Sequence, residues 1–192
     1  MDGISAGLSA VDSYGKESVK VRLAETGDAE KIRTVINRAF RPAEGFFVDD
    51  DRIDVAGVLS FLDTGQFLLA ENDQQLLGCV YVEPRPTSNP EDCRAYLGLL
   101  AVDPAYQQCG FGSVLMDAAE NYSRALGAAF MDIKVVSLRE GLFGYYRRRG
   151  YVATGTSPFP AEVMTKVSCH FVEMSKPLNH AQQTDVTVAS SS

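Results

Sequence analysis

The spacing of apolar residues along this 192-residue chain follows two patterns, one typical of strands and one typical of helices, and the resulting short elements follow one another closely. Apolar runs bounded by turn residues are typical of strands, whereas apolar residues three and four apart are typical of amphipathic helices. Strand-like runs occur at 19–23, 67–70, 76–82, 97–102, 131–135, 151–154 and 169–174. Helical spacing occurs at 26–40, 54–62, 111–126 and 142–149. The resulting order, β-α-α-β-β-β-α-β-α-β-β, predicts a mixed α/β fold around one sheet.

Residues that break regular structure separate several of these elements. Arg41-Pro42 is expected to end the first helix, because proline has no backbone N–H and its ring clashes with the preceding turn. Gly150 follows the last helix, where a left-handed residue is common. The stretch 154–166 is predicted to be a long loop.

Both ends of the chain lack hydrophobic periodicity. Residues 1–17 mix Gly, Ser, Ala and Asp and are predicted to form a flexible arm. Residues 178–192, rich in Gln, Thr and Ser, are predicted to form a disordered tail. The region between them, 18–177, has the length of one domain with a full core.

The stretch 97–126 carries the strongest chemical signal. A strand stops at Asp103-Pro104, an amphipathic helix begins at Phe111, and Gly110 and Gly112 lie at the junction. Glycines allow close backbone approach, and the free amides and dipole of a helix start favour an anion, most naturally a pyrophosphate. The alternative is a glycine-softened turn without a ligand. The loop lacks the lysine of a Walker A motif and the third glycine of a dinucleotide fingerprint.

A different anion-binding pattern, Gln/Arg-x-x-Gly-x-Gly/Ala, is filled by Gln107, Gly110 and Gly112. Placed after a strand that ends in Ala-Val-Asp-Pro, it resembles the acetyl-CoA loop of the GNAT superfamily of N-acetyltransferases. The resemblance covers residues 18–177. It implies acetyl-CoA as cosubstrate, no metal, and a mixed, mostly antiparallel sheet of about seven strands flanked by about four helices.

The resemblance also implies which residues hold acetyl-CoA. In the family the end of the fourth strand splays from the fifth and pairs with the pantetheine arm, which places Leu99, Leu100, Ala101 and Val102 there. The Leu100 amide becomes the expected oxyanion donor. The amides of Gln108, Cys109, Gly110, Phe111 and Gly112, with Ser113, would hold the pyrophosphate, and Gln107 fills a position where arginine is common.

A second family signature resembles residues 143–151, in which an aromatic pair precedes a glycine and an aromatic residue. Tyr146 then occupies the position of the usual general acid, which protonates the departing thiolate. The alternative is a core tyrosine with its hydroxyl on a carbonyl. Arg139 stands where many relatives have asparagine, and would contact the pantetheine.

The general base and the acceptor site are less defined. Tyr96 replaces the glutamate of histone-type relatives, so Glu83 acting through water, or no base at all, is expected. The loops 41–54 and 154–167 would select the acceptor. The first of these loops carries acidic residues beside two aromatic ones, namely Glu44 and Asp49–Asp51 beside Phe46 and Phe47. The acidic residues could attract a cationic amine, or they could simply form an exposed acidic loop.

Composition excludes several other classes of function. The net charge of −7 and pI near 4.8 argue against nucleic-acid binding. No apolar run has the length of a membrane span, and no secretory signal is visible, so a cytoplasmic protein is expected. The four cysteines lack the spacing of a zinc site or a disulfide framework.

Three functions remain open. The first is acetylation of a small-molecule primary amine by a monomer or homodimer, with Tyr146 as general acid. The second is acetylation of a protein lysine or N-terminus. The third is a noncatalytic acyl-CoA sensor, which the presence of Tyr146 disfavours.

Overall fold

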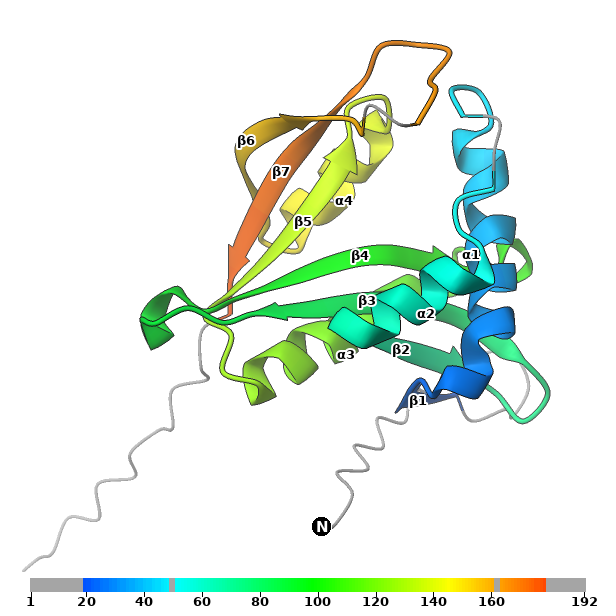
Figure 1. Ribbon diagram of the computed structural model, residues 1–192, viewed down its shortest axis with the longest axis horizontal. Coiled ribbons are helices and arrows are strands. Elements are labelled where there is room, and N and C mark those ends of the chain that lie inside the picture. Colours follow the sequence, from blue (N-terminus) through cyan, green and yellow to red (C-terminus); the bar gives the residue numbers. More distant parts are fainter. Residues whose placement is uncertain (1–18, 49–50, 161–162, 179–192) are drawn as a thin grey trace, which may run out of the picture.

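A computed structural model describes residues 19–48, 51–160 and 163–178 as one seven-stranded sheet with helices on both faces (Figure 1). The sheet order is β1-β2-β3-β4-β5-β7-β6. The strands are β1 (Lys20–Leu23), β2 (Gln66–Glu71), β3 (Leu76–Arg85), β4 (Arg94–Val102), β5 (Phe130–Val136), β6 (Val152–Pro158) and β7 (His170–Pro177). The helices are α1 (Ala29–Glu44), α2 (Val55–Thr64), α3 (Phe111–Ala125) and α4 (Glu140–Arg148), with short 3₁₀ turns at Thr26–Asp28, Pro90–Asp92 and Pro104–Tyr106. The predicted element order and mixed fold are confirmed.

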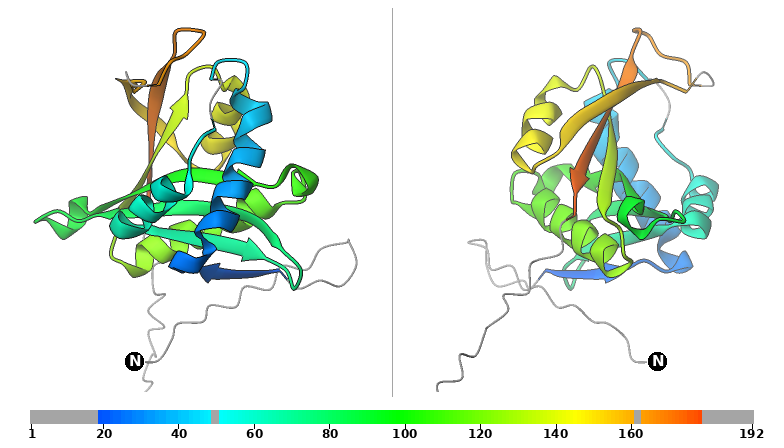
Figure 2. Two further views of the ribbon diagram at one scale, coloured as in Figure 1. Left: turned by 45° about the vertical axis from the view of Figure 1, so that its right-hand side comes forward. Right: turned by 90° about the vertical axis from the view of Figure 1, so that its left-hand side faces the viewer.

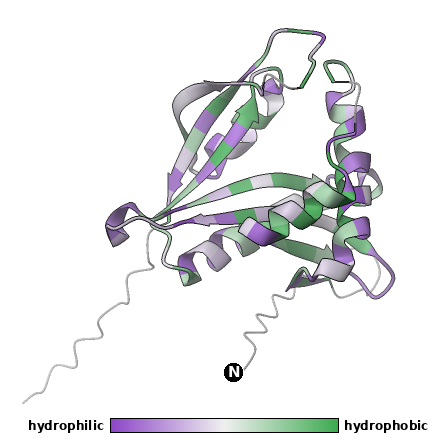
Figure 3. Ribbon diagram, in the orientation of Figure 1, coloured by the Kyte–Doolittle hydropathy of each residue, from purple (hydrophilic) through white to green (hydrophobic). Residues whose placement is uncertain are grey.

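The sheet separates two hydrophobic cores, one beneath α1 and α2 and the other beneath α3 and α4 (Figure 2). The stripe of α1 contributes Ile32 and Ile36 to the first core, and α3 contributes Leu115 and Met116 to the second. Strands β2 and β3 are buried on both faces, so their segments read as continuous apolar runs rather than as alternation (Figure 3).

The sheet opens into a V in its middle. Strands β4 and β5 run parallel but pair only over 94–97 and 130–133. Beyond that point β5 continues alongside β7, whereas the end of β4 stays with β3 and diverges from β5. Figure 1 shows the two arms and the upper half of α1 standing across the open side.

A β-bulge interrupts β4 where the arms separate. Its register with β3 passes from Gly98 to Ala101, so that Leu99 and Leu100 have no ladder partner in β3. They have none in β5 either, and Leu99 has a φ of +49°. The bulge reverses the alternation: Leu99 packs with the α1–α2 core, and Leu100 with the opposite core.

The structure corrects two predicted boundaries. Helix α1 does not end at Arg41-Pro42 but runs to Glu44. Proline is tolerated there because it lies in the last turn, which Gly45 closes by donating its amide to the Arg41 carbonyl at 2.9 Å. The predicted loop from residue 154 is also too long, since β6 extends to Pro158 in pairing with β7.

The domain continues to Leu178, which is 1% exposed and donates its amide to the Ala129 carbonyl. The predicted arm lies outside the described residues, as does the predicted tail after Leu178. None of the helices in the described part of the chain has the length and apolar character needed to cross a bilayer.

Candidate active site

A groove of about 290 Å³ lies at the open end of the V. One wall is the C-terminal half of α1, and the facing residues come from β4, from the loop after it and from the turn before α4. The lining residues are Ala39, Phe40, Pro42, Ala43, Leu100, Val102, Gln107 and Arg139. The last four are sequence-predicted site residues, far apart in the chain, and the fold brings them together.

The bulged turn of β4 leaves backbone polar groups beside this groove. Leu100 lines the groove, and neither neighbouring strand pairs with it. Backbone amides outside a ladder are free to bind a ligand. Ala101, by contrast, is 1% exposed and returns to the ladder with Cys79.

The loop between β4 and α3 has left-handed backbone at two positions just before the helix. Gln108 and Gly110 have φ values of +66° and +87°, and Gly110 is the N-cap of α3. The first bonds of the helix run from Ser113 and Val114 to the Gly110 carbonyl. The backbone amides before Ser113 therefore form no hydrogen bond within the helix.

Two side chains of this loop, Gln107 and Cys109, lie against backbone carbonyl groups. Gln107 donates its amide Nε2 to the Val102 carbonyl at 3.2 Å, which fixes the loop to the end of β4. The Cys109 thiol lies 3.7 Å from the Gln107 carbonyl. A Cβ atom on Gly110 would meet no atom within 4 Å, so the space above the loop is open.

Two adjacent tyrosines, Tyr145 and Tyr146, lie in α4, and neither is a lining residue of the groove. Tyr146 is 8% exposed, and burial raises the pKa of its phenol to about 12, so it stays protonated at neutral pH. Its hydroxyl forms no hydrogen bond within the described residues, whereas its ring packs against Tyr145 and Tyr151. The Tyr145 hydroxyl is fully buried without a partner in the same residues, about 4.0 Å from the Cβ position of Gly112.

Residues 24–151 match the model of the acetyltransferase (GNAT) family. The chain belongs to this family. The predicted family and fold are confirmed, and the enzyme class is that of an acetyltransferase. The roles of single residues stay predictions.

Relatives of this GNAT domain agree with the assignment. An amino-acid acetyltransferase of Azotobacter vinelandii is 28% identical over 99 residues, which are 52% of this chain and 21% of that protein. The aligned part therefore spans about a fifth of that relative's length.

Solved structures share the fold. A Salmonella typhimurium protein solved with acetyl-CoA has a TM-score of 0.66 at 17% identity, over 88% of this chain and 98% of its own. The ribosomal-protein-S18-alanine N-acetyltransferase of Escherichia coli has a TM-score of 0.62 at 14% identity, over 86% of this chain and 97% of its own. At these identities the likeness concerns the fold alone.

On the acceptor side of this GNAT domain, Glu44 differs from its predicted environment. It lies in the last turn of α1 and is only 7% exposed, so the acidic-loop interpretation is wrong for this residue. The helical period could have placed it, since Glu44 follows the buried Asn37 by seven residues. Asp49 and Asp50 lie outside the described residues, and Asp51 pairs with Arg41.

The candidate base Glu83 is engaged elsewhere. Its carboxylate pairs with the Arg85 guanidinium at 3.2 Å. The Arg85 guanidinium also lies over the ring of Tyr96, 4.6 Å from its centroid. Glu83 is therefore a weak candidate for the base.

The two predicted acceptor loops contact each other across the open side of the V. Lys166 donates its amide to the Phe47 carbonyl at 2.9 Å and its ammonium to the Gly45 carbonyl at 3.2 Å. The Phe47 ring meets Phe159, which stacks on Phe171 of β7. These contacts join the end of α1 to the outer arm of the sheet.

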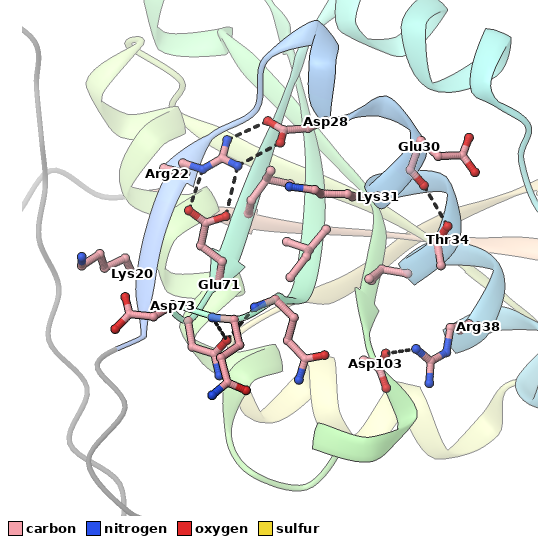
Figure 4. Close-up of a pocket in the computed structure, with 16 residues that line it drawn as sticks. Lys20, Arg22, Asp28, Glu30, Lys31, Thr34, Arg38, Glu71, Asp73 and Asp103 are labelled. Atoms are coloured by element: carbon pink, nitrogen blue, oxygen red, sulfur yellow. Dashed lines mark hydrogen bonds and ion pairs between the residues drawn. The ribbon is translucent and has the colours of Figure 1, made fainter.

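A second cavity, of about 630 Å³, lies between the N-terminal half of α1 and the β2–β3 hairpin (Figure 4). Opposite charges there form ion pairs. Arg22 binds both Asp28 and Glu71, and Arg38 binds Asp103 at 2.9 Å. This arrangement ties β1 and β2 to α1, and we assign it to stability.

Substitution of Asp28 tests that assignment. Asp28 accepts hydrogen bonds from Arg22 and from the Glu25 amide, so Asp28→Asn should lower the free energy of unfolding by about 1–2 kcal/mol. The hydrogen bond from Arg22 holds the pKa of Asp28 at about 2, below its ordinary 3.8. Its stabilisation is therefore present above about pH 4 and lost as the pH falls towards about 2.

Urea denaturation at several pH values measures this effect. The exposed Asp63→Asn in α2 is the control and should behave as the wild type. An Asp28→Asn variant with wild-type stability and acid dependence would contradict the structural role.

We note that the described residues contain no cluster of three or more metal-binding side chains. The prediction that no metal is needed stays a prediction.

Proposed function

We propose that this GNAT domain transfers an acetyl group from acetyl-CoA to the primary amine of a small molecule. The observation that carries the proposal is the groove in which the unpaired turn of β4, Gln107 of the loop after it and Arg139 before α4 face α1. The acetyl-CoA in the Salmonella typhimurium structure supports the cosubstrate.

Each predicted site residue has a role in this transfer. The amides of 108–112 and Ser113 bind the pyrophosphate at the positive end of α3. The backbone of 99–102 pairs with the pantetheine arm, and Arg139 contacts it. The Leu100 amide stabilises the oxyanion, where one preorganised donor contributes about 10²–10³ in rate.

Tyr146 completes the reaction as general acid. The phenol protonates the thiolate as the carbon–sulfur bond breaks. Burial supports this role, because it keeps the phenol neutral and hence able to give a proton.

A small acceptor fits the open side of the V, which the two acceptor loops bridge, better than a polypeptide does. The contacts of Lys166 and Phe159 with residues 45–47 bridge the two acceptor loops. A peptide that crossed the sheet there would have to break them. The Azotobacter vinelandii relative, an amino-acid acetyltransferase, also acts on small molecules by its name.

Thiol release from acetyl-CoA tests the proposal. The wild-type protein is offered single amino acids, polyamines, other small primary amines, and peptides with a free N-terminus or lysine. Release with small amines alone is expected. Release with peptides alone would assign a protein acetyltransferase, and no release despite acetyl-CoA binding would assign a sensor.

A further inference from the structure

Among the buried acidic side chains of the described residues, Glu44 differs in having no cation bonded to it. Asp28, Asp103 and Glu120 each pair with a cation, namely Arg22 at 2.7 Å, Arg38 at 2.9 Å and Lys176 at 2.7 Å. Glu44 as a residue is 7% exposed, and its carboxylate forms no hydrogen bond or ion pair with any described residue. A buried charge is costly without a partner, so a cation in direct contact would stabilise this side chain.

The position of Glu44 indicates where that cation would come from. It follows Ala43, which lines the groove together with Leu100 and Arg139. It also shares a helix face with Asn37, whose side chain exchanges two hydrogen bonds with Ile53 in the segment before α2. Glu44 is not itself a lining residue of the groove, but it lies beside the groove wall at the end of α1, within the predicted acceptor loop.

The charges around Glu44 connect it with the predicted general acid. Burial raises the pKa of Glu44, while the guanidinium groups of Arg52 and Arg139 act against the rise. Arg139 also acts on the phenol of Tyr146. One guanidinium therefore lies within electrostatic range of both side chains.

We infer that Glu44 binds the ammonium group of the acceptor and accepts its proton. The inference rests on the proposed function and narrows the substrate class to aliphatic primary amines, which arrive as cations. It also names a general base that is neither Glu83 nor water.

The protons balance as follows. The Glu44 carboxylate takes one proton from R–NH₃⁺, and the freed lone pair forms the bond to the thioester carbonyl carbon. The carbon–sulfur electrons leave on sulfur, which takes the proton of Tyr146. The tyrosinate regains a proton from the second N–H of the adduct, and Glu44 releases its proton to solvent, so each amide formed yields one thiol and one proton.

The variant Glu44→Gln keeps the shape of the side chain but removes its charge and basicity. With the best amine of the panel, kcat/KM at neutral pH should fall by about tenfold or more, as for a lost general base. Acetyl-CoA affinity should not change. The deficit should shrink as the pH approaches the pKa of the amine itself, because a neutral amine needs no base.

A structural role would give different results. Removing an unpaired buried charge should leave the variant at least as stable as the wild type at neutral pH, whereas loss of a structural contact would lower its melting temperature. Glu30→Gln, on the exposed side of the same helix, is the matched control and should keep wild-type kinetics.

Three results would overturn the inference. They are unchanged kcat/KM in Glu44→Gln, an equal loss in Glu30→Gln, and a pH-independent loss accompanied by weaker acetyl-CoA binding. Any of these in an enzyme that acetylates amines leaves the proposed function standing. A wild-type protein that acetylates no amine overturns both.

Discussion

Replacing Tyr146 with phenylalanine should lower kcat by between about 10² and 10⁴, the usual contribution of a general acid. The substitution keeps the ring and its packing against Tyr145 and Tyr151. It removes no hydrogen bond to a described residue, so the fold and acetyl-CoA affinity should be unchanged. Steady-state kinetics with the best amine, beside calorimetric titration with acetyl-CoA, measures both quantities.

Tyr145→Phe is the matched control from the adjacent position. Successive helix residues point about 100° apart, so the two phenols cannot serve one sulfur atom. The Tyr145 hydroxyl is buried without a partner in the described structure, so its removal should leave kcat intact and slightly raise stability. If Tyr145→Phe is the damaging variant, the acid has been assigned to the wrong tyrosine. If neither matters, water protonates the thiolate.

Replacing Gly110 with aspartate should weaken acetyl-CoA binding more than about tenfold, or ~1.4 kcal/mol. A Cβ there meets no atom within 4 Å outside its chain neighbours, so the new side chain starts in open space and its charge lies where we place the pyrophosphate. Calorimetry with acetyl-CoA measures the loss.

Gly110→Asn separates charge from backbone strain. Gly110 has a φ of +87°, a conformation that asparagine and aspartate adopt more readily than other residues. Both variants bear similar strain and bulk, but only aspartate repels phosphate. If both variants bind acetyl-CoA equally weakly, strain or bulk dominates. If both bind it as tightly as the wild type, the loop is not part of the acetyl-CoA site.

The hydrophobic periodicity of the sequence was sufficient to predict the helices and strands of this fold. The stripe of α3 and the alternation in β5 are strong because each element buries one side against the sheet. Boundaries were less predictable, as Pro42 illustrates. A proline in the last turn costs little, and nothing local marks the difference between that turn and a helix end.

The site was predictable only in part. Gly110 marks the loop in the sequence, because its φ of +87° favours glycine, whereas Gly112 lies within α3. The bulge at Leu99 and Leu100 has no such signal, since 97–102 is apolar almost throughout and a slip in alternation cannot be seen. The lack of a partner for Glu44 is equally invisible in the sequence, because it depends on which cations fold back towards α1.

The central claim is acetyl transfer to an amine, and its most direct test measures both products of one reaction. The wild-type protein is incubated with acetyl-CoA and a small amine, free thiol is titrated, and the N-acetylated amine is quantified by mass spectrometry. The account predicts equal amounts of amide and thiol. Thiol without amide would mean hydrolysis, and binding of acetyl-CoA with neither product would mean a sensor; either result would contradict it.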